Sequence, residues 1–204
     1  MSAPMPFCDA SERNRRPILQ VLRTVFPAQG RVLEIGAGSG QHAEYFSAEL
    51  PGLTWLPSER QTALAGLQER VRQAGRDNLL APIALDVLHD DFPPGDFQAM
   101  FSANTAHIMS WKAVQAMFRG VGARLRGGGV FALYGPFNVD GRFTASSNES
   151  FDQVLRQRDP AMGLRDMAAL ESLAGRHQLC LECARPMPAN NFTLVFRSTM
   201  ENST

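Results

Sequence analysis

The sequence has little of several features that define other classes of protein. Of its twenty cationic residues only Lys112 is a lysine, and twenty acidic residues balance them to a formal net charge of zero. No global basic field is therefore available to hold nucleic acid or an anionic membrane. No apolar run reaches the roughly 18–20 residues that a membrane span needs. The first thirty residues are too charged to contain the apolar core of a signal peptide. We therefore expect a cytoplasmic protein.

Cysteine is also scarce, with Cys8, Cys180 and Cys183 as the three examples in 204 residues. Three thiols cannot pair evenly, and reduced thiols suit the cytoplasm. Cys180 and Cys183 have the spacing of a redox motif, but the alternating segment QLCLECARP predicts a strand, where residues three apart point to opposite faces. The four histidines lack the spacing of metal ligands. The sequence therefore favours packing cysteines and predicts no metal site.

The composition, with 44% hydrophobic and 20% charged residues, is typical of a globular protein, and the length favours a single domain over residues 1–204. Strand-like runs alternate with helix-like stretches, which predicts an α/β fold with a mostly parallel sheet. Strands are expected at 31–35, 53–56, 81–85, 97–102, 130–134, 179–184 and 192–197. The last two are separated by the turn-prone segment PMPANN and no helix, so they should form an antiparallel hairpin at the sheet edge.

Two further segments complete the expected fold. An apolar stripe predicts an N-terminal helix over about 9–26, with Ser11 as its cap. Residues 127–129 are three glycines, which we expect to turn the chain into the fifth strand. The segment over about 135–160 is rich in Gly, Asn, Ser and Phe. We expect this segment to be a lid-like insertion over a functional site.

The strongest chemical signal is VLEIGAGSG, in which a buried strand ends in Gly36, Gly38 and Gly40. Alternating glycines let the backbone turn tightly and approach a ligand closely. Nicotinamide, flavin and adenosylmethionine binders all use such loops, but the dinucleotide pattern wants Gly or Ala where this chain has Gln41. Glu34 comes two residues before the loop, where a carboxylate suits a cationic ligand such as S-adenosylmethionine better than a pyrophosphate.

Two more acids follow the next two expected strands. Glu59 follows the second strand, where a carboxylate can accept hydrogen bonds from two ribose hydroxyls. Asp86 follows the third strand, where it can accept from an adenine amino group while the amide of Val87 donates to the ring. Each acid alone is more simply a helix cap or a solvated loop residue. The ordered set of glycine loop, Glu59 and Asp86 favours a nucleoside ligand.

These motifs resemble the first three motifs of class I S-adenosylmethionine-dependent methyltransferases, over about residues 30–135. A narrower resemblance covers nearly the whole chain: SERNRRPIL, GSGQH, ANTAHI, YGPF, SNESFD, GLRD and MPANN resemble the small family that includes methyltransferase-like protein twenty-six. The resemblance implies a Rossmann-like seven-stranded sheet, in agreement with the strand count, and S-adenosylmethionine as cofactor with S-adenosylhomocysteine as product. It names no acceptor. One departure is Glu59, where the wider class often has Asp.

Residues after the fourth and fifth strands should face the methyl group, because ligands of open α/β sheets bind beyond the carboxyl ends of the strands. Asn104 is expected at the amino-acid end of the cofactor. His107 is the candidate proton acceptor or acceptor ligand, with a neutral packed histidine as the alternative. Tyr134 is the candidate to orient the acceptor by its hydroxyl, with simple packing of its ring as the alternative. Asn14 lies on the N-terminal helix, which can fold over the strand ends, so we expect it to contact the cofactor.

The insertion and its neighbours supply the candidate acceptor contacts, for which turn chemistry is the alternative explanation. They are Phe137, Asn148, Phe151, Asp152, Arg165 and Asn191. The hypothesis is methyl transfer from S-adenosylmethionine to a small-molecule acceptor. The alternative is a protein that binds S-adenosylmethionine or S-adenosylhomocysteine and regulates a partner without turnover. A nicotinamide-dependent oxidoreductase is less consistent with Gln41 and the short chain, and the sequence leaves the oligomeric state open.

Overall fold

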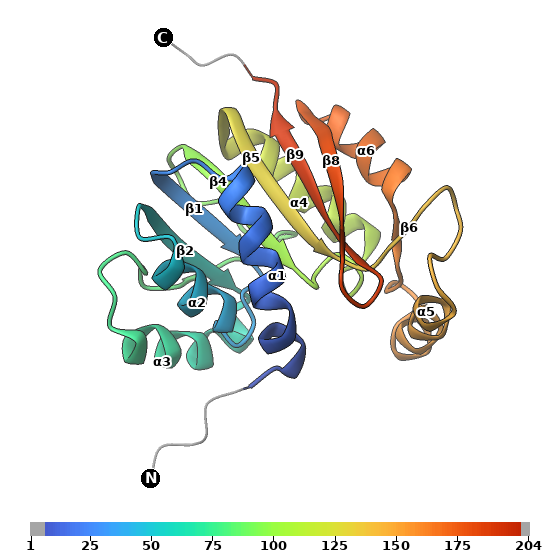
Figure 1. The fold of residues 1–204 in the computed structure, drawn as a ribbon, viewed down its shortest axis with the longest axis horizontal. Coiled ribbons are helices and arrows are strands. Elements are labelled where there is room, and N and C mark those ends of the chain that lie inside the picture. The colour runs from blue at the N-terminus through green and yellow to red at the C-terminus, as the bar shows by residue number, and fades with distance from the viewer. Residues whose placement is uncertain (1–6, 201–204) are drawn as a thin grey trace.

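A seven-stranded sheet forms the centre of the protein in the computed structural model, which describes residues 7–200 (Figure 1). Its strands are β1 (Gly30–Ile35), β2 (Leu53–Glu59), β3 (Ile83–Ala84), β4 (Phe97–Ala103), β5 (Leu125–Gly135), β8 (Leu179–Met187) and β9 (Asn191–Ser198). They lie in the order β3-β2-β1-β4-β5-β9-β8. The first five pair in parallel, and β9 runs antiparallel to both β5 and β8. The predicted seven-stranded, mostly parallel sheet with a C-terminal antiparallel hairpin is confirmed.

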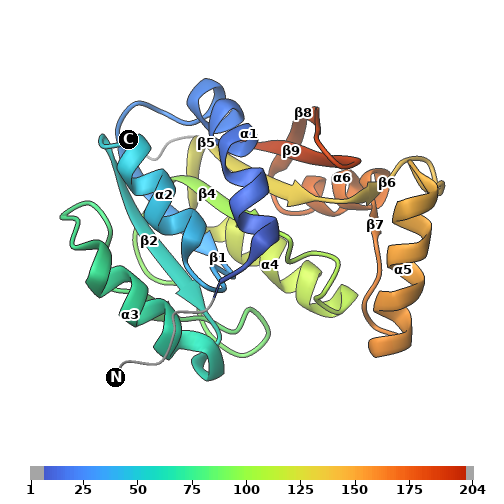
Figure 2. The same ribbon diagram turned by 60° about the horizontal axis from the view of Figure 1, so that its bottom comes forward.

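Helices cover both faces of this sheet (Figures 1 and 2). They are α1 (Asp9–Val25), α2 (Gln41–Glu49), a 3-10 turn (Gln61–Ala63), α3 (Leu64–Ala74), α4 (Trp111–Arg124), α5 (Ser146–Arg158) and α6 (Met167–Gly175). The residues of α1, α2 and α3 pack into one hydrophobic cluster and those of α4 and α6 into the other. Among residues 7–200, no helix combines the length and apolar character that crossing a membrane requires.

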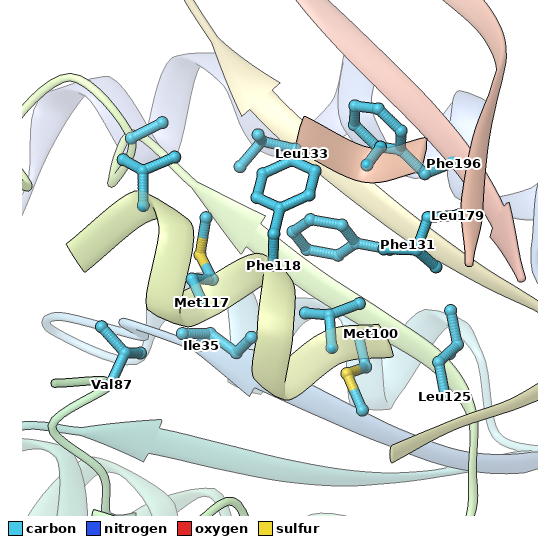
Figure 3. Close-up of a cluster of buried hydrophobic side chains, with 14 of the residues drawn as sticks. Ile35, Val87, Met100, Met117, Phe118, Leu125, Phe131, Leu133, Leu179 and Phe196 are labelled. Atoms are coloured by element: carbon cyan, nitrogen blue, oxygen red, sulfur yellow. The ribbon is translucent and has the colours of Figure 1, made fainter. Parts of the chain in front are cut away.

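Packed aromatic rings fill both clusters. On the α4 side, Phe118, Phe131 and Phe196 meet with ring centroids 5.2–6.0 Å apart (Figure 3). On the α1 side, Phe46 contacts Trp55 and Phe101 at 5.6 and 5.4 Å. Burying each such side chain contributes about 1.5–3 kcal/mol. The rigid sheet that results holds the strand ends, and therefore the candidate site, in fixed positions.

The candidate site lies where the strand order reverses. From β1 the chain moves outward to β2 and β3, and then returns to place β4 on the other side of β1. The carboxyl ends of β1 and β4 are tied together, because the hydroxyl of Ser102 donates to the carbonyl of Ile35 at 2.7 Å. Such a reversal leaves a crevice at the carboxyl edge, which is the usual ligand position in open α/β sheets.

Two local predictions were wrong. The first helix begins at Asp9 with Cys8 as its N-cap, so Ser11 lies inside the helix and does not cap it. The reason is a long-range contact: the amide of Cys8 donates to Oε1 of Gln41 at 2.6 Å, which fixes the chain before Ser11 is reached. The glycines at 127–129 do not precede the fifth strand as a turn. They belong to β5, which begins at Leu125 opposite Phe97 and continues past an irregularity in that pairing.

The segment after β5 is more structured than its composition indicates. It contains α5 and a small parallel pair, β6 (Phe137–Asn138) and β7 (Arg165–Asp166). Helix α5 stands clear of the two helical layers, at the end of the molecule next to β6 and β7 (Figure 2). It is anchored to the hairpin, since Nδ2 of Asn148 donates to the carbonyl of Asn190 at 3.0 Å. We call residues 135–166 the insertion from here on.

The two cysteines of the C-x-x-C sequence lie on β8, as the alternating pattern predicts. Cys180 is exposed, whereas Cys183 is partly buried against the α1-side cluster. The pairing of β8 with β9 shifts between Leu181 and Cys183. In the described part of the chain no group of three or more His, Cys, Asp or Glu side chains is placed to hold a metal ion.

Candidate functional site

The glycine loop joins β1 to α2, and each of its three glycines has a positive φ, between 56° and 77°. A Cβ on Gly36 would lie 2.7 Å from Cγ2 of Thr105, and one on Gly40 would lie 2.6 Å from Cδ1 of Leu67. These two glycines are therefore required by close packing as well as by conformation. A Cβ on Gly38 would meet nothing within 4 Å. The loop thus leaves open space above Gly38, where a ligand can approach the backbone.

Glu34 lies on β1, two residues before Gly36, and is 1% exposed. Its Oε2 accepts a hydrogen bond from Nε1 of Trp55 at 2.6 Å. Burial raises the pKa of Glu34 to about 8; the Trp55 hydrogen bond opposes this shift, and the nearby charge of Glu59 adds to it. A buried acid with so little compensation is poised to ionise when a cation binds next to it.

Glu59 is the last residue of β2, and Asp86 follows β3. Both carboxylates accept hydrogen bonds from backbone amides. Oε2 of Glu59 accepts from the amide of Gly38 at 2.8 Å, so this carboxylate reaches the glycine loop from the neighbouring strand. Oδ1 of Asp86 accepts from the amide of Leu88 at 2.9 Å, which lowers the pKa of Asp86. Val87, beside it, is buried in the α4-side cluster. The structure therefore brings Glu59 next to the glycine loop and holds Asp86 ionised on the neighbouring β3 side.

The loop after β4 carries a strained residue. Asn104 has a φ of +58°, and its amide donates to the carbonyl of Tyr134 at the end of β5. Non-glycine residues in this conformation concentrate at functional sites, and asparagine tolerates it best. Next to it, Oγ1 of Thr105 lies 2.6 Å from Oγ of Ser102, while its methyl group packs against Gly36. The loop that carries Asn104 is thus fitted to the glycine loop.

Asn14 connects three elements at the carboxyl edge of the sheet. Its Oδ1 lies 2.7 Å from Nε2 of His42 on α2, and its side chain also hydrogen-bonds Tyr134 on β5. The His42 ring stacks on Phe46 and is buried, which lowers the pKa of His42 to about 4. Burial raises the pKa of Tyr134, so both partners of Asn14 are neutral near pH 7. This network fixes α1 over the strand ends.

His107 lies on the other face of the end of β5. A Cβ on Gly135 would lie 3.7 Å from its Nδ1, and Gly135 faces away from the neighbouring Tyr134 because side chains alternate along a strand. The two residues predicted to act together on the acceptor are therefore on opposite sides of this strand end. Burial and, second, the positive charge of Arg165 lower the pKa of His107 to about 4, so its imidazole is neutral at pH 7.

Most of the predicted acceptor contacts serve to fix the insertion in place. Asp152 forms an ion pair with Arg156 and accepts a hydrogen bond from the amide of Leu164. The guanidinium of Arg165 donates to three backbone carbonyls, those of Ala106, Met109 and Ala161. Asn148 binds Thr144 and Asn190, and Asn191 binds the carbonyls of Pro188 and Ala189 within the hairpin turn. Phe137 is buried in the α4-side cluster. That these side chains also touch an acceptor stays a prediction. Phe151 alone among them is exposed, next to His107.

Sequence reasoning missed three residues that shape the site. Gln41, the first residue of α2, accepts from the amide of Cys8 and the hydroxyl of Ser39, and its buried Nε2 has no partner among the described residues. His42 holds Asn14, and Trp55 holds Glu34. Gln41 and His42 belong to the quoted GSGQH motif, so their position was a usable signal. Trp55 gave none, because its indole contact depends on the pairing of β1 with β2.

The strand order, the glycine loop after β1 and the acids at β2 and β3 together define the Rossmann-like methyltransferase fold. The chain belongs to the family described as "Protein of unknown function (DUF938)", whose model matches residues 5–198. Similar solved structures include an O-methyltransferase family protein from Burkholderia thailandensis (15% identity, TM-score 0.81). They also include a mitomycin 7-O-methyltransferase (16%, 0.77) and human N-acetylserotonin methyltransferase in complex with SAM (14%, 0.77).

The matched region is nearly all of this chain but little more than half of each similar structure. The three structures match 95%, 93% and 94% of this chain but only 59%, 55% and 53% of their own chains. The chain therefore spans between about half and three fifths of the length of each. At these sequence identities the likeness shows the fold, and what the whole relatives bind or methylate bears on this chain only as a proposal.

Proposed function

We propose that the protein transfers a methyl group from S-adenosylmethionine to a small-molecule acceptor. The observation that carries the proposal is the open space above Gly38, which has the carboxylate of Glu59 at its edge. The buried acid Glu34, whose pKa responds to the charge of Glu59, lies on the strand that leads into the same loop. A ligand that carries ribose hydroxyls and cationic groups complements these carboxylates. The three similar methyltransferases named above support the same reading, as does the narrower sequence likeness to the family of methyltransferase-like protein twenty-six.

The residues present fit this cofactor. Glu59 and Asp86 offer carboxylate oxygens for the ribose and the adenine amino group, and Glu34 offers one for a cation. Gln41 adds a buried amide donor that has no partner among residues 7–200. It begins α2, and an anionic group such as a carboxylate binds favourably at a helix N-terminus. Asn104, in the loop after β4, and Asn14, which contacts His42 on α2, are proposed to bind the amino-acid end of the cofactor.

When bound, S-adenosylmethionine supplies the methyl group: an acceptor lone pair bonds to the methyl carbon, the carbon–sulfur bond breaks with its electrons left on sulfur, and S-adenosylhomocysteine remains. The protein contributes mainly placement, because holding reactants in line supplies about 7–11 kcal/mol of barrier reduction. His107, neutral at pH 7, is the proposed acceptor-side residue that receives a hydrogen bond or proton. Tyr134 acts from the other side of β5 through Asn14, and is therefore proposed to position α1.

The test is formation of S-adenosylhomocysteine by the purified protein with a panel of metabolites, together with calorimetric binding of both sulfur nucleosides. Glu59→Ala is expected to weaken nucleoside binding by about 1–3 kcal/mol, the scale for leaving buried hydroxyl partners unpaired. Glu49→Ala, a surface acid paired with Arg23, is the matched control and should leave binding unchanged. Tight NADH binding with no binding of either sulfur nucleoside would overturn the proposal.

A further inference from the structure

A groove of about 320 Å³ runs across the helices on one face of the protein, where α2 lies between α1 and α3 (Figures 1 and 2). This volume is within the range of small-molecule sites. No residue that lines the groove belongs to a strand, so the groove is a hollow of the helical layer. Two of the motifs quoted above meet in it, because Arg15 of SERNRRPIL and Gln41 of GSGQH both line it.

Gln41 contributes a buried amide group of which only the oxygen is satisfied. The side chain is 5% exposed, and its Oε1 accepts from the amide of Cys8 at 2.6 Å and from the hydroxyl of Ser39 at 2.9 Å. Because a backbone amide can only donate, this contact fixes which end of the carboxamide is the oxygen. The Nε2 of Gln41 has no partner among residues 7–200. A buried donor without a partner is costly, so this amide indicates a ligand with an acceptor group.

The charges that line the groove favour an anion. They come from three arginines and two glutamates, an excess of one positive charge. Both glutamates are occupied, since Glu12 pairs with Arg15 and Glu44 pairs with Arg70 at 2.7 Å. Arg76 is exposed and forms no ion pair with an acid of residues 7–200. The N-terminus of α2 adds the positive end of a helix dipole.

Aromatic rings give the groove an apolar part as well. The guanidinium of Arg15 lies 4.6 Å from the centroid of the Tyr45 ring, which holds this charge over an aromatic surface. Phe7, which also lines the groove, is 65% exposed. Covering such a side chain removes apolar surface from water, so a ligand with an apolar body gains more than a bare ion.

We propose that the groove binds a small organic anion, in which an oxyanion (a carboxylate or a phosphate) is carried on an apolar body. The oxyanion accepts from Nε2 of Gln41 and from the guanidinium groups of Arg15 and Arg76, whose planar forks suit both oxyanions. The apolar body covers the rings of Phe7 and Tyr45. This site is additional to the proposed methyl transfer, which offers neither arginine to the cofactor.

Four probes test the inference: phenylacetate, phenyl phosphate, the cation phenethylamine, and inorganic phosphate, which has no apolar body. The full chain is titrated with each, without nucleoside because the proposed cofactor would share Gln41, and the ring signals of the four histidines are followed by NMR. We expect at least one organic anion to bind about tenfold more tightly than phenethylamine and inorganic phosphate. The tighter of the two organic anions identifies the oxyanion. No binding of either, or equal binding of the amine or of inorganic phosphate, overturns the inference.

The signal of His42 reports where the anion binds. His42 follows Gln41 in the chain, and burial and, second, the positive charge of Arg15 lower its pKa. An anion beside Arg15 should therefore shift the His42 signal. It should leave His177 unchanged, because His177 packs against Gly122 of α4 on the other face of the sheet. Binding that shifts His177 and not His42 overturns the inference.

Variants of two exposed arginines supply the second arm. Arg76→Met is expected to weaken binding of the organic anion about fivefold, because it removes a charged donor from the groove. Arg72→Met is the matched control, since Arg72 pairs with Glu69 on α3 and does not line the groove. The melting temperatures of both variants check that the fold is intact, and Arg76→Gln replaces Arg76→Met if the latter does not fold. Equal affinity for the anion in the Arg72 and Arg76 variants overturns the inference.

Discussion

Glu34 is expected to make binding of the proposed cofactor sensitive to pH, because its carboxyl group is buried. With its pKa raised to about 8, Glu34 is mostly protonated in the folded protein at pH 7. The ammonium of a bound sulfur nucleoside next to this acid would favour the carboxylate and expel the proton. We therefore expect up to about one proton to be released per S-adenosylhomocysteine bound at pH 7. Affinity should rise by up to about tenfold per pH unit below pH 8 and level off above it.

Calorimetry at pH 7 in phosphate and in Tris measures the proton release directly, because the apparent enthalpies differ by the buffer's heat of ionisation for each proton released. Glu34→Gln should abolish the release and weaken binding at pH 8. The same variant has a readout without ligand. As pH rises from 5 to 8, the unfolding free energy of the variant should increase by about 3 kcal/mol relative to that of the wild type. The reason is that the buried Glu34 of the wild type stays protonated in the folded state but ionises on unfolding.

Two outcomes separate the parts of this reasoning. If affinity is flat from pH 6 to pH 8 while the stability difference appears, Glu34 is a buried neutral acid that does not meet the cofactor's cation. If the stability difference is also missing, the carboxyl is not held protonated and the burial argument fails. Glu49→Gln, at an exposed ion pair with Arg23, is the control and should change neither measurement.

Three further predictions follow from buried contacts. First, the pKa values of His42 and His107 fall from 6.5 to about 4 on folding, so stability is lost as pH falls through that window, whereas Glu34 makes stability fall as pH rises from 4.5 to 8. The free energy of unfolding, measured with urea, should therefore have a maximum near pH 6.5 and be lower by about 1 kcal/mol at pH 5. A free energy that rises steadily up to pH 8 would contradict this. Second, Asn14→Ala removes the link between His42 and Tyr134 and should cost about 1–3 kcal/mol of stability and reduce cofactor affinity. Removal of residues 1–20, part of which lies outside the described residues, should reduce cofactor affinity more than it lowers the melting temperature without ligand. Unchanged nucleoside affinity in a folded variant would show that α1 is not part of the site. Third, Arg165→Met should raise the pKa of His107, followed by NMR, because it removes the positive charge that lowers this pKa. Arg158→Met, at the exposed end of α5, is the control and should leave the pKa of His107 unchanged. Equal pKa values of His107 in the two variants would contradict the effect of the Arg165 charge.

Much of the fold was readable because it depends on local pattern. Apolar runs ending in glycine or acid mark the parallel strands, and the lack of a helix between the last two strands marks the hairpin. The positions of Gly36, Gly38 and Gly40 followed from the same logic, since a sharp strand-to-helix turn needs positive φ wherever it occurs. The exception was the insertion. Helix α5 has a polar sequence with few apolar positions, so its periodicity is weak. Its contacts, from Asn148 to Asn190 and from Phe151 to His107, reach residues far away along the chain.

The sequence by itself determined the strands, the glycine loop and the order in which the acids follow the strands, because the pattern of nearby residues decides each of these. Only the tertiary structure decided which side chains remain available. It assigned Asp152 and Arg165 to holding the insertion in place, put His107 and Tyr134 on opposite faces of β5, and left Phe151 exposed beside His107. Burial and charge from distant elements also set the ionisation of Glu34 and His107. The sequence fixes the type of each residue, but tertiary packing decides how far its side chain is exposed to water and which groups it contacts.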